Sequence, residues 1–456
     1  MKLGPDRPTV LFSVETAARE LDSKLVMACA LAERGCRSIV GHKEAVTEIA
    51  RSSRRVVWQG KSLFSVRSDN HLADRLIENG SAVVFITDEG AMHQADSWVE
   101  QTLHKHWTDH FRTRRVHRMC VWGARQGEVV SAHLPALRGR ISVTGSARFD
   151  LCSPDYSWLS REPNAATGFG DDGFILACTR FSALAHSKGM AAPFQIKLNR
   201  NAWPASISTE EVTDVWFKKW RQDAHDFAEF VVLVKEMARG YPKLTVVIRP
   251  HPSESTEFYQ QAFATVRNVT VRREGNVLDW IRPARVVVHS NSTSGVEAVL
   301  ARRPVVNFLP SSSDRDGLDV EVAREAGVTA GSVAEALGHV DRLLSGDAFT
   351  HEWSDDARSM LNNLNEAAVP LLVKQTLEAL DEETIDSSSV TLPGGGGLRA
   401  NVRRVLKRTE DRYLTSKRGR LSSEYVETVV AGCRSRGIGA ARVRQMTDRY
   451  VVIEPV

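Results

Sequence analysis

The stretch Thr245–Leu309 decides the fold, through TVVIRPHPSES at residues 245–255 and VVVHSNSTSGVEAVLARRPVVNFL at residues 286–309. Its β-branched runs, Val246–Ile248 and Val286–Val288, are typical of strands buried in a parallel sheet. The second run leads through a hydroxyl-rich loop into a helix, and a further apolar strand follows. The stretch therefore predicts an α/β unit with parallel strands.

Polar side chains follow both runs at the points where the strands are expected to end. In an open α/β sheet, ligands bind outside the carboxyl ends of the strands, and a helix N-terminus favours an anion. The alternative is that the hydroxyl groups only cap the following helix. There is no GxxxxGK[ST] loop, which favours a nucleotide-sugar over ATP or NAD. The predicted phosphate-binding residues are Arg249, His251, Ser290, Ser292, Thr293, Ser294 and Glu297.

Size and composition predict a soluble cytoplasmic protein with two domains and an appendage. The chain has 456 residues, of which 42% are hydrophobic and 25% are charged, and its net charge is +4. That charge is too small to indicate nucleic acid by itself. No apolar run reaches the roughly eighteen residues of a membrane span, and the N-terminus lacks the apolar core of a signal peptide. The six cysteines form no CxxC pair, so we expect neither a zinc site nor a disulfide framework.

Short apolar strands alternate with helical stretches in the first part of the chain. This alternation predicts a parallel, doubly wound sheet. The strand over 82–86 ends in Asp88 and Glu89, which are candidates for a general base or a nucleophile. The alternative is a helix cap with an acid that complements the helix dipole. His93 follows within a turn and is a candidate for contact with the acid or the ligand.

Two other strand ends of the first domain carry candidate cleft residues. Glu15 follows the strand over 9–14, and Arg19 lies in the next helix. Gly145 and Arg148 follow the strand over 141–144, with Asp150 just beyond them. A structural tie between Arg148 and Asp150 is the alternative to a role in the cleft.

Composition divides the chain into four parts. Residues 155–173 are rich in Asp, Pro, Gly and Asn, as linkers are. Glycines 394–397 indicate a flexible linker, and the strongly basic stretch 399–420 follows. This stretch is a solvated face, a site for an anionic membrane surface or a site for nucleic acid, and it lacks the interleaved aromatics of single-strand binders. The predicted parts are a first Rossmann-like domain over 1–160, a second over 170–350, closing helices over 351–386, and a flexible, basic appendage over 387–456.

Several motifs occur together in an order that resembles one family of enzymes. They are VETAARELDSKLVMACALAERGCRSIVG, TDEG, VWG, VTGSARFD, RPHP and SNSTSGVEAVLARRPVV. The chain thus resembles the bacterial surface carbohydrate biosynthesis proteins, which are similar to GT-B glycosyltransferases, including retaining β-Kdo transferases that use CMP-Kdo. The resemblance covers roughly residues 8–309 and the helices after them. An insertion around Asn201 and the basic tail depart from the family pattern.

The resemblance implies a GT-B-like fold with two Rossmann-like domains that face a cleft. It implies that the second domain binds a nucleotide-sugar donor, with His251 and the hydroxyls of Ser292, Thr293 and Ser294 at its phosphate. It implies an acceptor on the first domain, a glycan or lipid-linked glycan, and a catalytic carboxylate at Asp88 or Glu89. No cofactor or metal is expected. Whether Asp150 acts as a nucleophile, and whether the reaction is retaining or inverting, stays open.

The leading hypothesis is a metal-independent glycosyltransferase of capsule or lipopolysaccharide synthesis that uses CMP-Kdo or a related CMP-sugar. We expect it in the cytoplasm, with a peripheral place at the inner membrane as a further hypothesis based on the tail. The alternatives are a CDP-glycerol glycerophosphotransferase and a catalytically silent nucleotide-sugar-binding scaffold. A nucleic-acid partner is not expected, because the basic residues are concentrated in one appendage.

Overall fold

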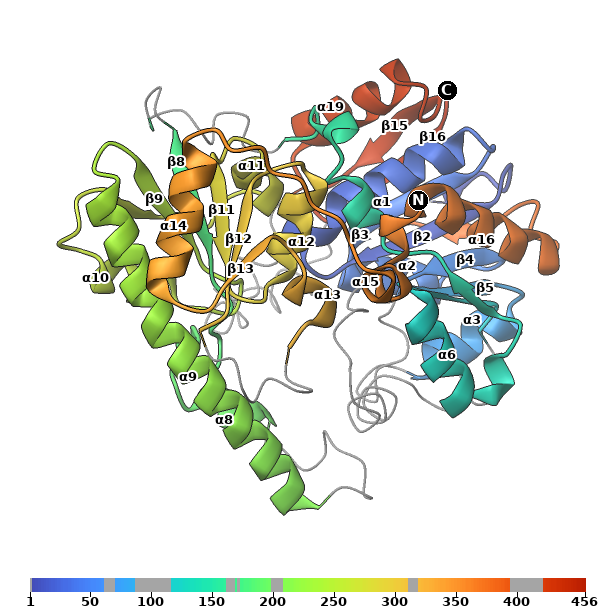
Figure 1. Cartoon of the computed structure of the whole chain (residues 1–456). Coiled ribbons are helices and arrows are strands. Elements are labelled where there is room, and N and C mark those ends of the chain that lie inside the picture. Colours follow the sequence, from blue (N-terminus) through green and yellow to red (C-terminus); the bar gives the residue numbers. More distant parts are fainter. Residues whose placement is uncertain are drawn as a thin grey trace, which may run out of the picture. The chain divides into compact units, whose positions relative to one another are not determined.

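The computed structural model describes residues 2–60, 70–86, 116–160, 169, 173–197, 208–310, 319–393 and 421–456. These residues form two compact units. The first contains the described residues up to 86, residues 116–151 and the described residues from 365 onward; the second contains the described part of 152–364. Each unit is built on a sheet of mainly parallel strands covered by helices (Figure 1). The predicted class of two doubly wound, Rossmann-like units is therefore confirmed.

The sheet of the second unit has the Rossmann strand order. Its six strands are all parallel and lie in the order β10-β9-β8-β11-β12-β13, which in chain order is 3-2-1-4-5-6. The strands that follow β8 in the chain, β9 and β10, lie on one side of it, whereas β11, β12 and β13 lie on the other side. The topological switch point therefore lies between β8 and β11. The strands are β8 (Phe174–Cys178), β9 (Thr245–Arg249), β10 (Val269–Val271), β11 (Val286–His289), β12 (Val305–Phe308) and β13 (Val328–Ala330).

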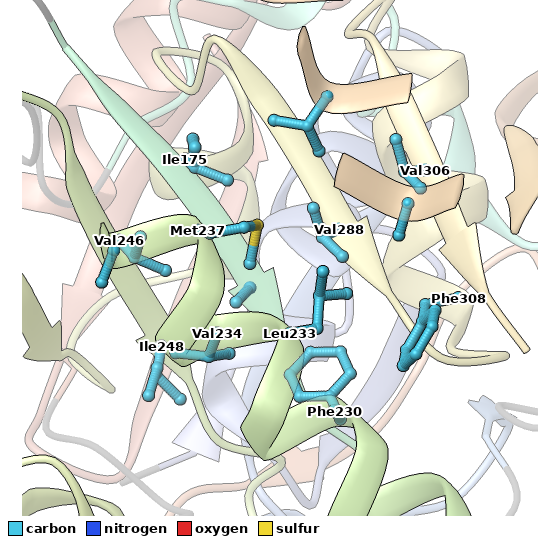
Figure 2. Packing of buried hydrophobic residues seen from close by; sticks show 14 of the residues in the cluster. Ile175, Phe230, Leu233, Val234, Met237, Val246, Ile248, Val288, Val306 and Phe308 are labelled. Atoms are coloured by element: carbon cyan, nitrogen blue, oxygen red, sulfur yellow. The ribbon is translucent and has the colours of Figure 1, made fainter. Parts of the chain in front are cut away.

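A long helix, α9 (Thr209–Gly240), packs on this sheet, and its buried side chains form a hydrophobic core together with those of the strands. Ser208 and Glu211 start the helix with a capping box. Its apolar residues recur at helical spacing, so that one stripe of the helix faces the strands. Figure 2 shows Phe230, Leu233 and Met237 of that stripe among buried strand residues. Full burial of each such side chain contributes about 1.5–3 kcal/mol to folding.

The remaining helices of the second unit cover both faces of the sheet. Helix α14 packs beside α9, whereas α12 packs against β11 and β12 from the other face (Figure 1). The helices are α8 (Ala192–Lys197), α10 (Thr256–Ala262), α11 (Val277–Ile281), α12 (Thr293–Leu300), α13 (Glu321–Arg324), α14 (Val333–Leu344) and α15 (Asp355–Met360), with 3-10 turns η2 (Pro154–Tyr156) and η4 (Asn362–Leu364).

The sheet of the first unit has eight strands in the order β15-β16-β3-β2-β4-β5-β6-β7. The six strands from β3 to β7 are parallel, and their chain order is 2-1-3-4-5-6. The switch point of this sheet lies between β2 and β4. The strands are β2 (Thr9–Val14), β3 (Arg37–His42), β4 (Val56–Gln59), β5 (Ala82–Ile86), β6 (Arg118–Val121), β7 (Ile141–Val143), β15 (Ala441–Met446) and β16 (Tyr450–Pro455).

The helices of the first unit come from three separated parts of the chain. A small two-stranded sheet joins β1 (Lys2–Leu3) to β14 (Val390–Thr391). The helices are α1 (Ala17–Ala32), α2 (Lys43–Arg51), α3 (Asn70–Glu78), α6 (Ala124–His133), α7 (Ala147–Asp150), α16 (Ala368–Glu382) and α19 (Ser423–Ser435), with the 3-10 turn η1 (Pro135–Leu137).

The C-terminal segment is part of the first unit, so the predicted flexible appendage over 387–456 is wrong for residues 387–393 and 421–456. Strand β16 pairs antiparallel with β3 and is buried over Tyr450–Ile453, because its Val-Val-Ile run is as apolar as a central strand. Gly41 of β3 permits this approach, since a Cβ there would lie 2.5 Å from the Tyr450 Cβ. Helix α19 packs against α1. The basic stretch 399–420 lies outside the described residues.

The predicted domain boundaries also shift. Residues 152–160 group with the second unit, although the first domain was predicted to extend to 160. The predicted closing helices over 351–386 are divided, because α15 belongs to the second unit and α16 to the first. Over the part of the chain that the structure describes, no helix is long and apolar enough to span a membrane.

Candidate functional site

The candidate site of the second unit lies at the carboxyl ends of β9, β8 and β11. These strands are neighbours, with β8 in the middle, and they end in Arg249, Cys178 and His289. The switch point between β8 and β11 is the place where an open α/β sheet leaves a crevice for a ligand. The residues that follow the three strands are therefore carried to one edge of the sheet.

His289 holds the loop after β11 in place. Its side chain is completely buried; Nδ1 accepts the Ser292 N–H at 3.1 Å, and Nε2 donates to the Ala326 carbonyl at 2.8 Å. Burial lowers the pKa of His289 to about 4, so the ring is neutral near pH 7. Gly295 makes room for the ring, because a Cβ at this position would lie 2.1 Å from Nε2. The histidine is therefore a structural clamp on the loop.

Asn291 fixes the middle of the same loop. Its φ of 48° lies in the left-handed region, which asparagine tolerates better than most residues. Its backbone N–H donates to the Asn307 side chain at 3.1 Å, and its side chain makes two hydrogen bonds with the backbone of Val320, at 2.7 and 3.0 Å. Arg180, directly after β8, donates to the Asn291 side-chain oxygen at 2.8 Å and to its carbonyl at 3.0 Å. The network places a guanidinium at the switch point.

The hydroxyl groups of residues 290–294 differ in their hydrogen bonds and in their burial. The Ser292 hydroxyl caps helix α12 by accepting the Ser294 N–H at 3.3 Å, and it is 2.7 Å from the Ser294 hydroxyl. Ser290, Ser292 and Ser294 are buried, whereas Thr293 is half-buried at the first helical position. The cap interpretation therefore holds for Ser292. The start of α12 and the Thr293 hydroxyl remain as groups that can meet a phosphate.

Arg249 is buried, and its guanidinium makes hydrogen bonds within the protein. Its guanidinium donates to the carbonyls of Glu274 and Gly275 at 2.8 and 2.9 Å and lies 5.8 Å from the centre of the Trp280 ring. Burial lowers the pKa of Arg249, although Cys178 and nearby acids, among them Glu297, act in the opposite direction. Because two of its donors hold the 274–275 turn, Arg249 acts on the site mainly as a local positive charge.

His251 is the half-buried side chain after β9. Its Nδ1 lies 2.7 Å from the Ser253 hydroxyl and accepts the Ser253 N–H at 3.3 Å. These contacts set the orientation of the ring at the edge of the sheet. A neutral or charged imidazole in this position is suited to donate a hydrogen bond to an anion.

Glu254 and Thr179 were not predicted from the sequence. Glu254 is completely buried, and its Oε2 accepts hydrogen bonds from the Thr179 and Tyr259 hydroxyls. Burial raises the pKa of Glu254 to about 7. Arg180 was also omitted, although it follows a strand end just as Arg249 does, and the same rule would have found it. Glu254 had no comparable signal, because its burial follows from tertiary packing.

The predicted residues of the first unit divide into three groups. Glu15 pairs with Lys43 at 2.9 Å. Arg19 and Arg148 line one pocket, and Gly145, with φ 76°, forms the turn that leads to Arg148. Asp150 accepts the backbone N–H groups of two residues that begin helix α16, at 2.9 and 2.7 Å.

Asp150 thus serves as a helix cap in the structure. The Arg148 guanidinium lies 4.6 Å from the centre of the Phe149 ring. Asp88, Glu89 and His93 lie outside the described residues. Over the described residues, no group of three or more His, Cys, Asp or Glu side chains is arranged to hold a metal ion.

Comparisons with known proteins identify the fold. No family model matches the chain, and no curated protein matches it. Among solved structures, the wall teichoic acid polymerase TagF, soaked with CDPG, has a TM-score of 0.50 and 12% identity over 84% of this chain and 90% of that chain. This likeness shows the fold alone, which is GT-B.

UDP-GlcNAc 2-epimerases are also similar in structure. The enzyme of Neisseria meningitidis, bound to UDP-GlcNAc, has a TM-score of 0.45 and 13% identity, with 82% of this chain and 100% of that chain covered. The enzyme of Methanocaldococcus jannaschii, in complex with UDP-GlcNAc and UDP, has a TM-score of 0.45 and 11% identity, with 82% and 99% covered.

Proposed function

We propose that the chain is a glycosyltransferase of surface polysaccharide synthesis whose donor is CMP-Kdo or a related CMP-sugar. The observation that carries the proposal is the fixed loop 289–294. It leads into the N-terminus of α12 at the switch point of a sheet with Rossmann order. The resemblance of the sequence motifs to surface carbohydrate enzymes supports the same class. In the proposal the acceptor is a glycan or lipid-linked glycan, and the enzyme works in the cytoplasm, at the inner membrane through the basic stretch 399–420.

The second unit would stabilise the leaving nucleotide. Negative charge develops on the donor phosphate as the glycosidic bond to it breaks. The positive end of the α12 dipole, the Thr293 hydroxyl and the His251 ring are the groups suited to meet that charge. Because His289 and Asn291 already hold the loop, these donors need little rearrangement when charge develops.

A carboxylate would act on the acceptor or on the sugar. Asp88 and Glu89 are our candidates, as a base in an inverting reaction or a nucleophile in a retaining one. Asp150 is the weaker candidate, because both of its oxygens already accept backbone N–H groups of α16.

The test uses the purified full-length chain. We expect CMP to raise its melting temperature, and CMP-Kdo to be consumed only when a glycan acceptor is present. Thr293→Val should weaken CMP binding by roughly ten- to a hundredfold, the effect of one hydrogen bond to a charged group. His251→Asn should weaken it similarly, whereas His225→Asn, at a histidine on α9 with a 55% exposed side chain, should not. If neither CMP nor any other cytidine nucleotide protects the protein from heat, the proposal is wrong.

A second candidate is a CDP-glycerol glycerophosphotransferase. The structural likeness to the teichoic acid polymerase favours it, because the same phosphate-binding groups would serve CDP-glycerol. This reaction makes a phosphodiester, whereas the first makes a glycoside. Incubation with CDP-glycerol and analysis of the product for phosphorus separates the two.

A further inference from the structure

A polar pocket lies in the first unit, at the switch point between β2 and β4. Its wall includes Gln59 at the end of β4 and residues of helix α1, which follows β2. Ser146 and Arg148, after β7, complete it. The pocket therefore occupies, in the first sheet, the same kind of position that the loop after β11 occupies in the second.

The side chains around this pocket carry more positive than negative charge. Three cations line it, Arg19, Lys24 and Arg148, against one carboxylate, Glu20. Lys24 and Glu20 form a buried ion pair at 2.7 Å, so their charges compensate each other. The other two cations of the lining are arginines, whose planar groups match the geometry of a carboxylate or a phosphate. The beginning of α1 adds the positive end of a sixteen-residue helix.

Gln59 provides the second observation that points to a ligand. Its side chain lines the pocket and the residue is only 1% exposed. Neither the amide nitrogen nor the amide oxygen has a hydrogen-bond partner among the described residues. Burial of an amide without partners is unfavourable, and such groups in folded proteins usually have a role. A ligand with one acceptor and one donor would satisfy both ends of the amide.

The size of the pocket limits what it can hold. Its volume of about 60 Å³ has room for about four to six water molecules, since each needs roughly 10–15 Å³ by the same measure. A carboxylate or phosphate with one neighbouring hydroxyl group fits this space, whereas a whole nucleotide does not.

We propose that this pocket binds an acidic end of the second substrate, an oxyanion with an adjacent hydroxyl, through Arg19, Arg148 and Gln59. The proposal rests on the proposed function, in which a glycan is the acceptor, and adds that the acceptor is acidic. The oxyanion is the carboxylate of a sugar acid or the phosphate of a phosphorylated polyol. The two arginines bind the oxyanion, while the Gln59 amide donates to it and accepts from the hydroxyl.

The test is calorimetry on the full-length chain with CMP present at saturation, so that the phosphate site of the second unit is filled. The probes are Kdo as a sugar acid, glycerol 3-phosphate as a phosphorylated polyol, inorganic phosphate and neutral glucose. We expect Kdo or glycerol 3-phosphate to bind, and the tighter of the two identifies the source of the oxyanion. Inorganic phosphate should bind more weakly, because it lacks the hydroxyl, and glucose should not bind.

The decisive variant is Gln59→Met, which keeps the shape of the side chain and removes the amide. It should weaken binding of the acidic probe by roughly ten- to a hundredfold and should raise the melting temperature of the ligand-free protein. The control Gln261→Met, at an exposed position of α10, should change neither. Arg19→Gln, compared with Arg51→Gln on the surface of α2, provides a second variant if the core substitution disturbs folding.

Equal binding by wild type and both pocket variants would overturn the proposal, as would binding of glucose in preference to the acids. Failure of the proposed function looks different. In that case CMP fails to protect the chain from heat, whereas the acidic probes still bind and the Gln59 variant still weakens them.

Discussion

Gly295 is the position where a single methyl group should do the most damage to the candidate site. A Cβ there would lie 2.1 Å from the His289 Nε2, 2.3 Å from Cε1 and 2.6 Å from Cδ2, whereas ordinary contacts begin at 3.4 Å. The ring would have to move by more than 1 Å. It is completely buried, and strand β11 fixes its backbone. We therefore expect Gly295→Ala to displace the ring or the start of α12.

The cost follows from the two hydrogen bonds that the ring makes. Displacement breaks the bond from Nε2 to the Ala326 carbonyl, at 2.8 Å, and the bond from the Ser292 N–H to Nδ1, at 3.1 Å. A buried polar group that loses its partner costs about 1–3 kcal/mol, and overpacking costs about as much. Gly295→Ala should thus lower the free energy of unfolding by about 2–5 kcal/mol. In the proposed function this loop positions the groups that meet the phosphate, so binding of CMP should weaken as well.

The control is Gly338→Ala in the middle of α14, in the same unit. No heavy atom lies within 4 Å of a Cβ built at this position. Alanine is favoured over glycine in a helix, so this variant should gain about 0.5–1 kcal/mol. Urea unfolding of both variants, followed by circular dichroism, measures the difference. If Gly295→Ala were as stable as wild type, the clamp that we assign to His289 would be wrong.

Three further predictions concern other parts of the chain. Burial raises the pKa of Glu254 to about 7 in the folded state, against an ordinary value of 4.5 in the unfolded chain, so the free energy of unfolding should fall as pH rises from 4.5 through 7. Glu254→Gln should remove this fall in a pH series of urea titrations, whereas Glu257→Gln, exposed on α10, should keep it. Asp150→Asn should destabilise the protein by about 0.5–2 kcal/mol through loss of the charged cap on α16, and the exposed control Asp155→Asn should not; loss of activity at unchanged stability would instead restore Asp150 as a nucleophile. Deletion of residues 421–456 should make the protein insoluble on expression, because it uncovers the edge of β3; a soluble, folded product with the wild-type melting temperature would contradict the role of β16.

The strands and the long helix could be predicted because their signals are local. β-branched runs such as Val286–Val288 are typical of buried parallel strands, and the capping box of Ser208 and Glu211 marks the start of α9. The sequence also indicated that polar residues follow the carboxyl ends of β9 and β11, and the structure ends these strands at Arg249 and His289.

The sequence could not show which of the polar side chains are hydrogen-bonded to other groups of the protein. Arg249 and Asn291 both stand in the polar clusters, but only the structure shows that they are bonded to backbone groups from distant loops. The C-terminal strand was missed for a related reason. The run Val451–Ile453 has the pattern of a strand, but no local pattern tells which sheet edge it joins, and the basic stretch before it favoured an appendage.

The discontinuity of the first unit has a consequence for synthesis of the chain on the ribosome. The second unit is nearly continuous in sequence, so all of its strands have emerged while α16, α19 and β16 are still to be translated. Until residues 450–455 arrive, β3 presents an open edge that can pair with a neighbouring nascent chain. A stop codon or a stalled ribosome near the very end of the message would therefore yield an aggregating product, even though every residue of the second unit had been made.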